Sequence, residues 1–214
     1  MMKHLVLSFT LTLALTWSPL ASAFMGVGET AEIIPQGQYR IGFAPQLYMG
    51  NGGGVDVGAY LDMNIDTSIN SRFELGSGVT QFWASGSLKW VPFPDYERQP
   101  AIGGRAVLMY VRDNNQNFFN TQITPIVSKK YDTKIGRMIP YAGLPFTFIY
   151  ENSVDNFVIS KLCFGSEWEV KKDFQTGAEL SIDLYNGSTT YGFTATSLTL
   201  FFNFQFDEKI GFKK

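Results

Sequence analysis

Hydrophobic and polar side chains alternate along much of the chain, most regularly in its last long segment. From Leu198 to Phe206 every second residue is large and apolar, and the residues between them are mostly polar. A side-chain period of two places the two sets on opposite faces of a β-strand. This segment is therefore predicted to be a strand with one apolar and one mostly polar face.

The same alternation, interrupted by Gly, Asn, Asp, Ser and Pro, divides the rest of the chain into further strands. Soluble strands average about five or six residues, whereas a tilted membrane strand needs about nine to eleven, and most of these segments are that long. We therefore expect an all-β protein, an antiparallel transmembrane up-and-down β-barrel of about ten strands with short loops; eight or twelve strands remain alternatives. The expected strands are 39–49, 55–64, 71–78, 81–93, 101–111, 119–128, 138–150, 157–170, 175–185 and 191–206.

Charged residues are segregated between the two faces. The apolar set contains no Asp, Glu, Lys or Arg, which suits a wall with hydrocarbon outside and a polar interior. Buried charges need partners, so we expect a charge network that fills a narrow lumen. A second interpretation is a glycosidase-like acid/base site built from its carboxylates. The predicted lumen charge network is Arg40, Arg72, Glu74, Lys89, Arg105, Lys161, Glu167, Glu169, Glu179 and Asp183.

Aromatic residues of the apolar set gather near the ends of the predicted strands. Two such rings are typical of the aromatic girdles at the two membrane interfaces, although aromatic residues also favour strands in general. The ring expected on the periplasmic side is Tyr39, Trp90, Trp168 and Phe206. The ring expected on the opposite side is Phe82, Tyr110 and Tyr150.

The N-terminus has the pattern of a secretory signal peptide: a basic start with Lys3, an apolar stretch over 5–17, and the small-x-small sequence that ends at Ala23. The apolar stretch is too short to span a membrane. The expected organisation is a cleaved signal peptide (1–23), a periplasmic segment leading into the barrel (24–37), the outer-membrane barrel (38–206) and a short periplasmic C-terminal tail (207–214).

The available residue types argue against catalysis. The single histidine, His4, lies in the signal peptide, so the mature chain has no side chain that titrates near neutrality and lacks the commonest nitrogen metal ligand. We therefore expect no enzyme activity, no metal and no cofactor. Cys163, on the lumen-side parity, is interpreted as a small buried filler. With 17 basic and 19 acidic residues and no basic patch, the chain is not expected to bind nucleic acid.

These features together resemble the small Gram-negative outer-membrane β-barrel proteins of the eight- to ten-stranded class. The last strand, with Phe202, Phe204 and Phe206, resembles the family's assembly signal, and Phe212 is a second candidate for its final aromatic. The resemblance implies outer-membrane lipid and the barrel assembly machinery as partners, and location in the cell outer membrane. We expect a structural barrel or a narrow pore for small solutes or ions; a barrel that binds a lipid or other hydrophobic ligand is the alternative, and a soluble periplasmic β-barrel comes third.

Overall fold

The computed structural model describes residues 26–49, 54–78, 81–113, 116–150, 156–184 and 195–207. The secondary structure of this part of the chain is all β-strand. Among these residues, no helix is both long enough and apolar enough to cross a membrane. The strands are β1 (Gln38–Met49), β2 (Val55–Asp66), β3 (Ile69–Ser77), β4 (Gln81–Phe93), β5 (Ala101–Asp113), β6 (Gln116–Ser128), β7 (Tyr131–Thr133), β8 (Gly136–Gly143), β9 (Phe146–Tyr150), β10 (Phe157–Lys171), β11 (Phe174–Asp183) and β12 (Thr196–Asp207).

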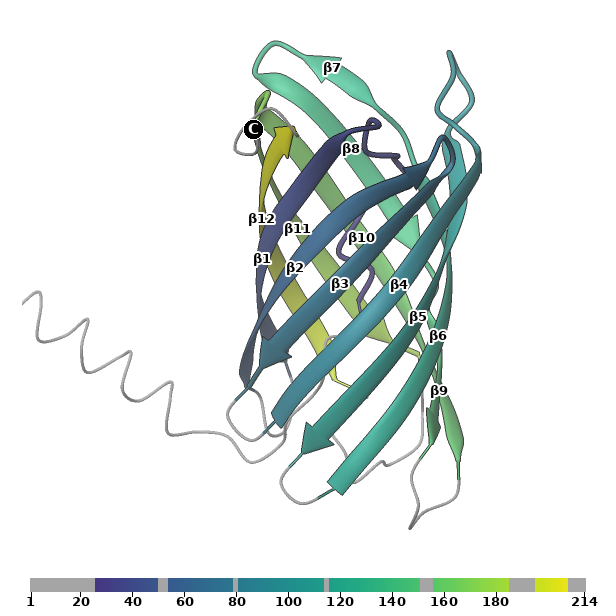
Figure 1. The fold of residues 1–214 in the computed structure, drawn as a ribbon, viewed down its shortest axis with the longest axis vertical. Helices are drawn as coiled ribbons and strands as arrows, with labels where there is room; N and C mark the ends of the chain where they lie inside the picture. The colour runs from purple at the N-terminus through teal and green to yellow at the C-terminus, as the bar shows by residue number, and fades with distance from the viewer. Residues whose placement is uncertain are drawn as a thin grey trace, which may run out of the picture.

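The strands form one closed antiparallel barrel, in which β1 to β6 and β10 to β12 each pair with the strand next to them in the chain (Figure 1). Closure is made by β1 and β12, whose register runs from Gln38 opposite Asp207 to Met49 opposite Thr196. β8 and β9 together occupy one position between β6 and β10, and β7 only extends the hairpin with β8, so the barrel has ten strands. The prediction of a ten-stranded up-and-down barrel is confirmed.

The predicted strand 138–150 is divided in two at Leu144 and Pro145. Proline has no N–H to donate to a ladder, so a proline inside a barrel strand needs an irregular step. At this step the Leu144 N–H donates to the Pro125 carbonyl at 3.2 Å, and the Lys161 N–H donates to the Pro145 carbonyl at 3.1 Å. Pairing with both neighbouring strands therefore continues across the break.

The alternation seen in the sequence is the alternation of outside and inside. On β5, Leu108 is 69% exposed on the outer face, whereas its neighbour Val107 is 3% exposed and points inward. Many outward positions of the other strands are likewise large and apolar, including Ile41, Leu75 and Ile123. The barrel thus presents a hydrocarbon-compatible outer wall.

The interior is less uniformly polar than the sequence analysis expected. Toward the end of the barrel where β1 ends and β2 begins, here called the far end, lumen-facing apolar side chains pack on one another. Trp83, Phe118 and Ile149 are among them, each 1% exposed or less. Buried polar side chains such as Gln46, Asp56 and Asn120 also lie in this half, so the expected polar lumen is here joined by packed apolar side chains, which gain free energy from burial as any core does.

The segment before β1, expected as a periplasmic lead-in, runs instead inside the barrel (Figure 1, purple trace between the walls). It enters from the end at which β1 begins and β12 ends, here called the near end. Residues 26–31 are buried along their whole length and contact the walls through Val27 and Ala31. We call residues 26–31 the plug. The expected C-terminal tail lies, apart from Asp207, outside the described residues.

Candidate functional site

Charged side chains form a continuous row across the first three strands. The register places Arg40, Asp62 and Arg72 opposite one another on β1, β2 and β3, all facing the lumen. Arg40 Nε donates to Asp62 Oδ2 at 2.7 Å, and Arg72 Nε donates to Asp62 Oδ1 at 2.5 Å. Arg40 Nη1 also reaches Glu167 Oε1 at 3.2 Å, on β10 across the lumen. These charge-assisted contacts tie opposite walls of the barrel together.

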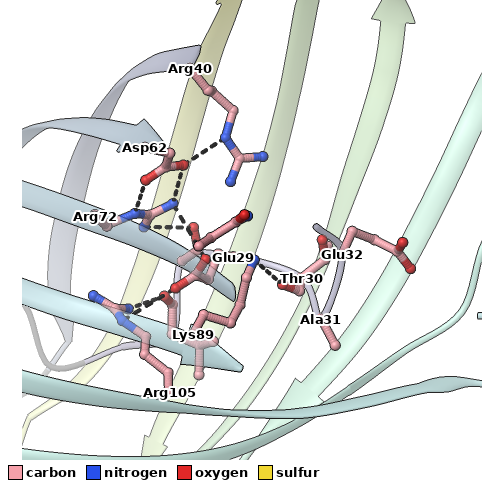
Figure 2. Close-up of polar contacts among 12 residues, drawn as sticks. Glu29, Thr30, Ala31, Glu32, Arg40, Asp62, Arg72, Lys89 and Arg105 are labelled. Atoms are coloured by element: carbon pink, nitrogen blue, oxygen red, sulfur yellow. Dashed lines mark hydrogen bonds and ion pairs between the residues drawn. The ribbon is translucent and has the colours of Figure 1, made fainter. Parts of the chain in front are cut away.

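Glu29 of the plug lies among three cations that come from three consecutive strands (Figure 2). Its Oε2 is 2.8 Å from Lys89 Nζ on β4, and its Oε1 is 3.2 Å from Arg105 Nε on β5. Arg72 Nη2, on β3, is 4.0 Å away. The side chains involved are at most 4% exposed. The carboxylate therefore provides the central negative charge of a buried cationic site.

The same three cations also bind the backbone of the plug. Arg105 Nη1 donates to the Val27 carbonyl at 2.7 Å, and Lys89 Nζ donates to the Thr30 carbonyl at 2.8 Å. Arg72 Nη1 donates to the Gly28 carbonyl at 3.3 Å. An irregular segment inside a barrel has no strand partner, so these donors supply the hydrogen bonds that its buried carbonyl groups need.

Glu179, on the opposite wall, binds the N–H side of the plug. Its carboxylate accepts hydrogen bonds from the backbone N–H groups of Val27 (2.9 Å) and Gly28 (2.7 Å). The Tyr141 hydroxyl donates to it at 2.8 Å, and so does the Ser181 hydroxyl at 2.8 Å. Cationic side chains thus bind the carbonyl groups of the plug, and an anionic side chain binds its N–H groups.

Two glycines allow this close approach. A Cβ at Gly26 would lie 2.2 Å from Glu179 Oε1, too close for any side chain. Gly28 has a φ of 58°, in the left-handed region that glycine adopts without strain. The glycine-rich start of the segment is therefore what lets it lie against the carboxylate.

The remaining predicted network residues divide by position. Glu74 lies 3.8 Å from Arg105, and both its carboxylate oxygens are buried with no hydrogen bond to any described residue. Lys161 and Asp183 face each other on β10 and β11, nearer the far end, where Lys161 also donates to the Ala195 carbonyl at 2.9 Å. Glu169 lies half-buried at the near end, 3.4 Å from Arg137. The structure therefore gathers most of the predicted set around the plug and leaves these last three outside that cluster.

Three residues central to the cluster were missed. Asp62 and Tyr141 lie at the alternate strand positions that face the lumen. The alternation of the sequence could therefore have identified both as lumen residues. Glu29 lies in a segment without periodicity, where only the neighbouring glycines hinted at a close approach. The alternation of apolar and polar residues identifies which strand residues face the lumen. It gives no position for a residue of an irregular segment.

The predicted girdle residues lie at the two ends of the barrel as expected from their strand positions. Tyr39 and Phe206 stack at the near end, with their ring centroids 5.5 Å apart. Trp90 is 58% exposed on the outer face near the same end. Trp168, on β10, donates from its indole N–H to the Ile135 carbonyl at 3.1 Å. Phe82, Tyr110 and Tyr150 lie toward the far end, exposed or half-buried.

An ion pair ties two loops together at the near end. Asp95, in the β4–β5 loop, pairs with Lys129 and accepts from the Lys130 backbone N–H at 2.7 Å. Lys129 Nζ also donates to the Glu97 carbonyl at 2.6 Å. Partial burial alone would raise the pKa of Asp95, but these hydrogen bonds from Lys129 and Lys130 outweigh it and hold the pKa below its ordinary value.

The carboxylates of the cluster are held by ion pairs and hydrogen bonds. Glu167 and Glu179, two carboxylates of the acid/base interpretation, are occupied by Arg40 and by the plug. Cys163 is fully buried with its Sγ 3.3 Å from the Ser181 hydroxyl, in the filler position expected. In the described part of the chain, no group of three or more His, Cys, Asp or Glu side chains is placed to hold a metal ion.

Comparisons with known proteins return structures only. No family model matches the chain, and no curated protein matches it. The translocator domain of the autotransporter NalP from Neisseria meningitidis is 9% identical, with a TM-score of 0.47, over 82% of this chain and 90% of that one. The N-terminal β-barrel domain of OprF from Pseudomonas aeruginosa is 15% identical, with a TM-score of 0.36, over 80% and 98%. Ail, the attachment invasion locus protein of Yersinia pestis, is 9% identical, with a TM-score of 0.25, over 80% and 100%.

The class of this protein follows from its own geometry. A closed antiparallel barrel of ten strands, with an apolar outer wall and a charged lumen, is a transmembrane β-barrel. It is consistent with a small outer-membrane barrel, as the sequence resemblance implied.

Proposed function

We propose that the protein is an integral outer-membrane barrel, exported through its cleavable signal, with a structural role or a role as a narrow pathway for small solutes or ions. The observation that carries this proposal is the occupied lumen: the plug and the charge cluster around Glu29 fill the near half. Packed apolar side chains occupy the far half. Barrels of about this size are filled by side chains, whereas aqueous porin channels need about sixteen strands.

The proposed orientation places the near end in the periplasm. β1 begins and β12 ends there, so both ends of the barrel lie on the side from which an exported chain arrives. The barrel's partners are then outer-membrane lipid and, during biogenesis, the assembly machinery. We also propose that the protein is not an enzyme. Its only histidine, His4, lies in the signal peptide and would be removed with it.

Fractionation and conductance test the proposal together. We expect the protein in detergent-extracted outer membrane, with heat-modifiable migration on gels, and little or no single-channel conductance after refolding into planar bilayers. Release by osmotic shock into the periplasmic fraction would contradict the membrane assignment. A large, stable, ion-selective conductance of the unmodified protein would contradict the closed lumen.

One observation favours the second candidate function, the binding of a hydrophobic ligand. A groove of about 990 Å³ runs along the outer face of β1–β6, with a floor of small residues that includes Ala59, Ala84 and Gly86 and walls that include Phe73 and Leu108. In a membrane its occupant would be an acyl chain of a lipid. Gly86→Leu, which fills the floor, should reduce the lipid retained through purification, measured by mass spectrometry, if this groove holds a lipid specifically.

A further inference from the structure

The cationic site around Glu29 surrounds a single carboxylate. The basic side chains of two arginines and a lysine converge on one carboxylate, from β3, β4 and β5. Those side chains are at most 3% exposed, so their charges gain little from water. Figure 2 shows Glu29 reaching into the space between Lys89 and Arg105 from a segment that belongs to none of the three strands.

The cations have too few other partners to balance them. Among the described residues, Arg72 pairs otherwise with Asp62, which it shares with Arg40, and Arg105 pairs otherwise with Glu74 at 3.8 Å. Lys89 has only Glu29 as an ion-pair partner within the described chain. If the carboxylate of Glu29 left, Lys89 would lose its one ion-pair partner among the described residues and Arg105 would keep only Glu74 at 3.8 Å, which is costly in a buried site unless an anion takes the place of Glu29.

The plug is held by a second, independent contact. Glu179 binds the Val27 and Gly28 N–H groups on the opposite wall, and this contact does not involve the side chain of Glu29. The three cations also donate to plug carbonyl groups, which a change at Glu29 leaves in place. The backbone of the plug can therefore keep the cavity closed around a replacement anion.

We propose that Arg72, Lys89 and Arg105 form a carboxylate-binding site in the lumen, which Glu29 occupies in cis and which a small soluble carboxylate occupies when that side chain is absent. Truncation to alanine removes from Glu29 a group with the same heavy atoms as an acetate ion, so acetate matches the vacated space in shape and charge. The site deepens the proposed function, because it lies in the closed lumen that the proposal describes.

The test is rescue of Glu29→Ala by acetate. The refolded variant is unfolded by heat or urea in detergent, in sodium acetate, sodium chloride and acetamide, with the two salts at equal ionic strength. With acetate at about ten times its dissociation constant, the folded-to-unfolded ratio should rise roughly tenfold relative to chloride. Acetamide, which has the same shape without the charge, should have no such effect.

Two matched variants make the result specific. Glu29→Gln keeps the volume of the side chain and leaves no space for acetate, so acetate and chloride should act alike on it. Glu32→Ala removes a partly exposed carboxylate, 2.5 Å from Lys130 at the near end, and should likewise show no preference for acetate. If Glu29→Ala fails to fold in chloride, the folded fraction recovered in acetate, read from the gel shift, is the measurement.

The outcomes are separable from those of the proposed function. Equal stability of Glu29→Ala in acetate and chloride would overturn the receptor, as would equal rescue of Glu29→Gln. Neither measurement involves conductance or localisation. A conducting or periplasmic wild-type protein would therefore contradict the proposed function and leave the acetate test to be judged on its own result.

Discussion

At the scale of single residues, the lumen is organised by carboxylates that each serve several donors. Asp62 accepts from two arginines, and Glu179 accepts from two backbone amides and two hydroxyl groups. Buried polar groups of this kind stabilise when every partner is present and destabilise strongly when one is removed. Single substitutions in the buried cluster should therefore lower the free energy of unfolding more than substitutions at the exposed rim.

Glu179→Ala should be among the most destabilising single changes. It leaves the Val27 and Gly28 N–H groups and the Tyr141 hydroxyl buried without their acceptor. The expected loss is about 3–5 kcal/mol, measured by urea unfolding in detergent. Glu169→Ala, at the half-buried rim, is the control and should cost about 1 kcal/mol or less. Equal losses would show that Glu179 does not anchor the plug.

Asp95→Asn should remove a pH-dependent contribution to stability from the ion pair between the two near-end loops. Because the folded-state pKa of Asp95 is lowered, its contribution to stability is present above the unfolded pKa of about 4 and is lost as the pH falls through the folded value. We expect the variant to be less stable than wild type by about 1 kcal/mol at pH 7, with the difference disappearing in acid. A difference that persists unchanged in acid would contradict the assignment.

At the scale of elements, the alternation of apolar and polar residues predicts where the strands lie. It does not predict where a strand is broken or where an irregular segment packs. The strand expected at 81–93 is β4 to the residue, and the strand expected at 157–170 is β10 to within one residue. The break at Pro145 was not predicted, because the apolar period continues across it. The plug was not predicted either, because an irregular segment has no period and its partners come from distant strands. The first residues of the strand expected at 191–206 lie outside the described residues.

Leu108→Arg tests which face of the strands meets hydrocarbon. Leu108 is 69% exposed at the middle of β5, where an arginine in a lipid-facing position should cost about 2–4 kcal/mol. Ile135, 66% exposed in the β7–β8 turn, is matched in exposure but lies beyond the barrel wall, so Ile135→Arg should cost little. Both are measured by unfolding in lipid vesicles. Equal costs would mean that the outer face of β5 is not in the membrane.

At the scale of the whole molecule, the N-terminal segment occupies the near half of the barrel's lumen. The pairing of β1 with β12 fixes the near end, and the segment before β1 turns back from there into the lumen. The wall and the plug are joined by ion pairs to β3, β4 and β5 and by hydrogen bonds to β11. Removal of the plug should therefore change what passes through the barrel more than it changes the wall.

Glu29→Lys should open the lumen. The substitution places a fourth cation among Arg72, Lys89 and Arg105, and like charges at these distances repel strongly in a buried site. The plug is then expected to leave the lumen, because β1–β12 closure does not depend on it. Planar-bilayer recordings should show conductance steps absent from wild type, with anions favoured by the exposed cations. Glu32→Lys, which reverses a charge at the half-buried rim, is the control and should conduct like wild type. A folded Glu29→Lys barrel without conductance would show that the apolar packing around Trp83 and Phe118, and not the plug, closes the lumen.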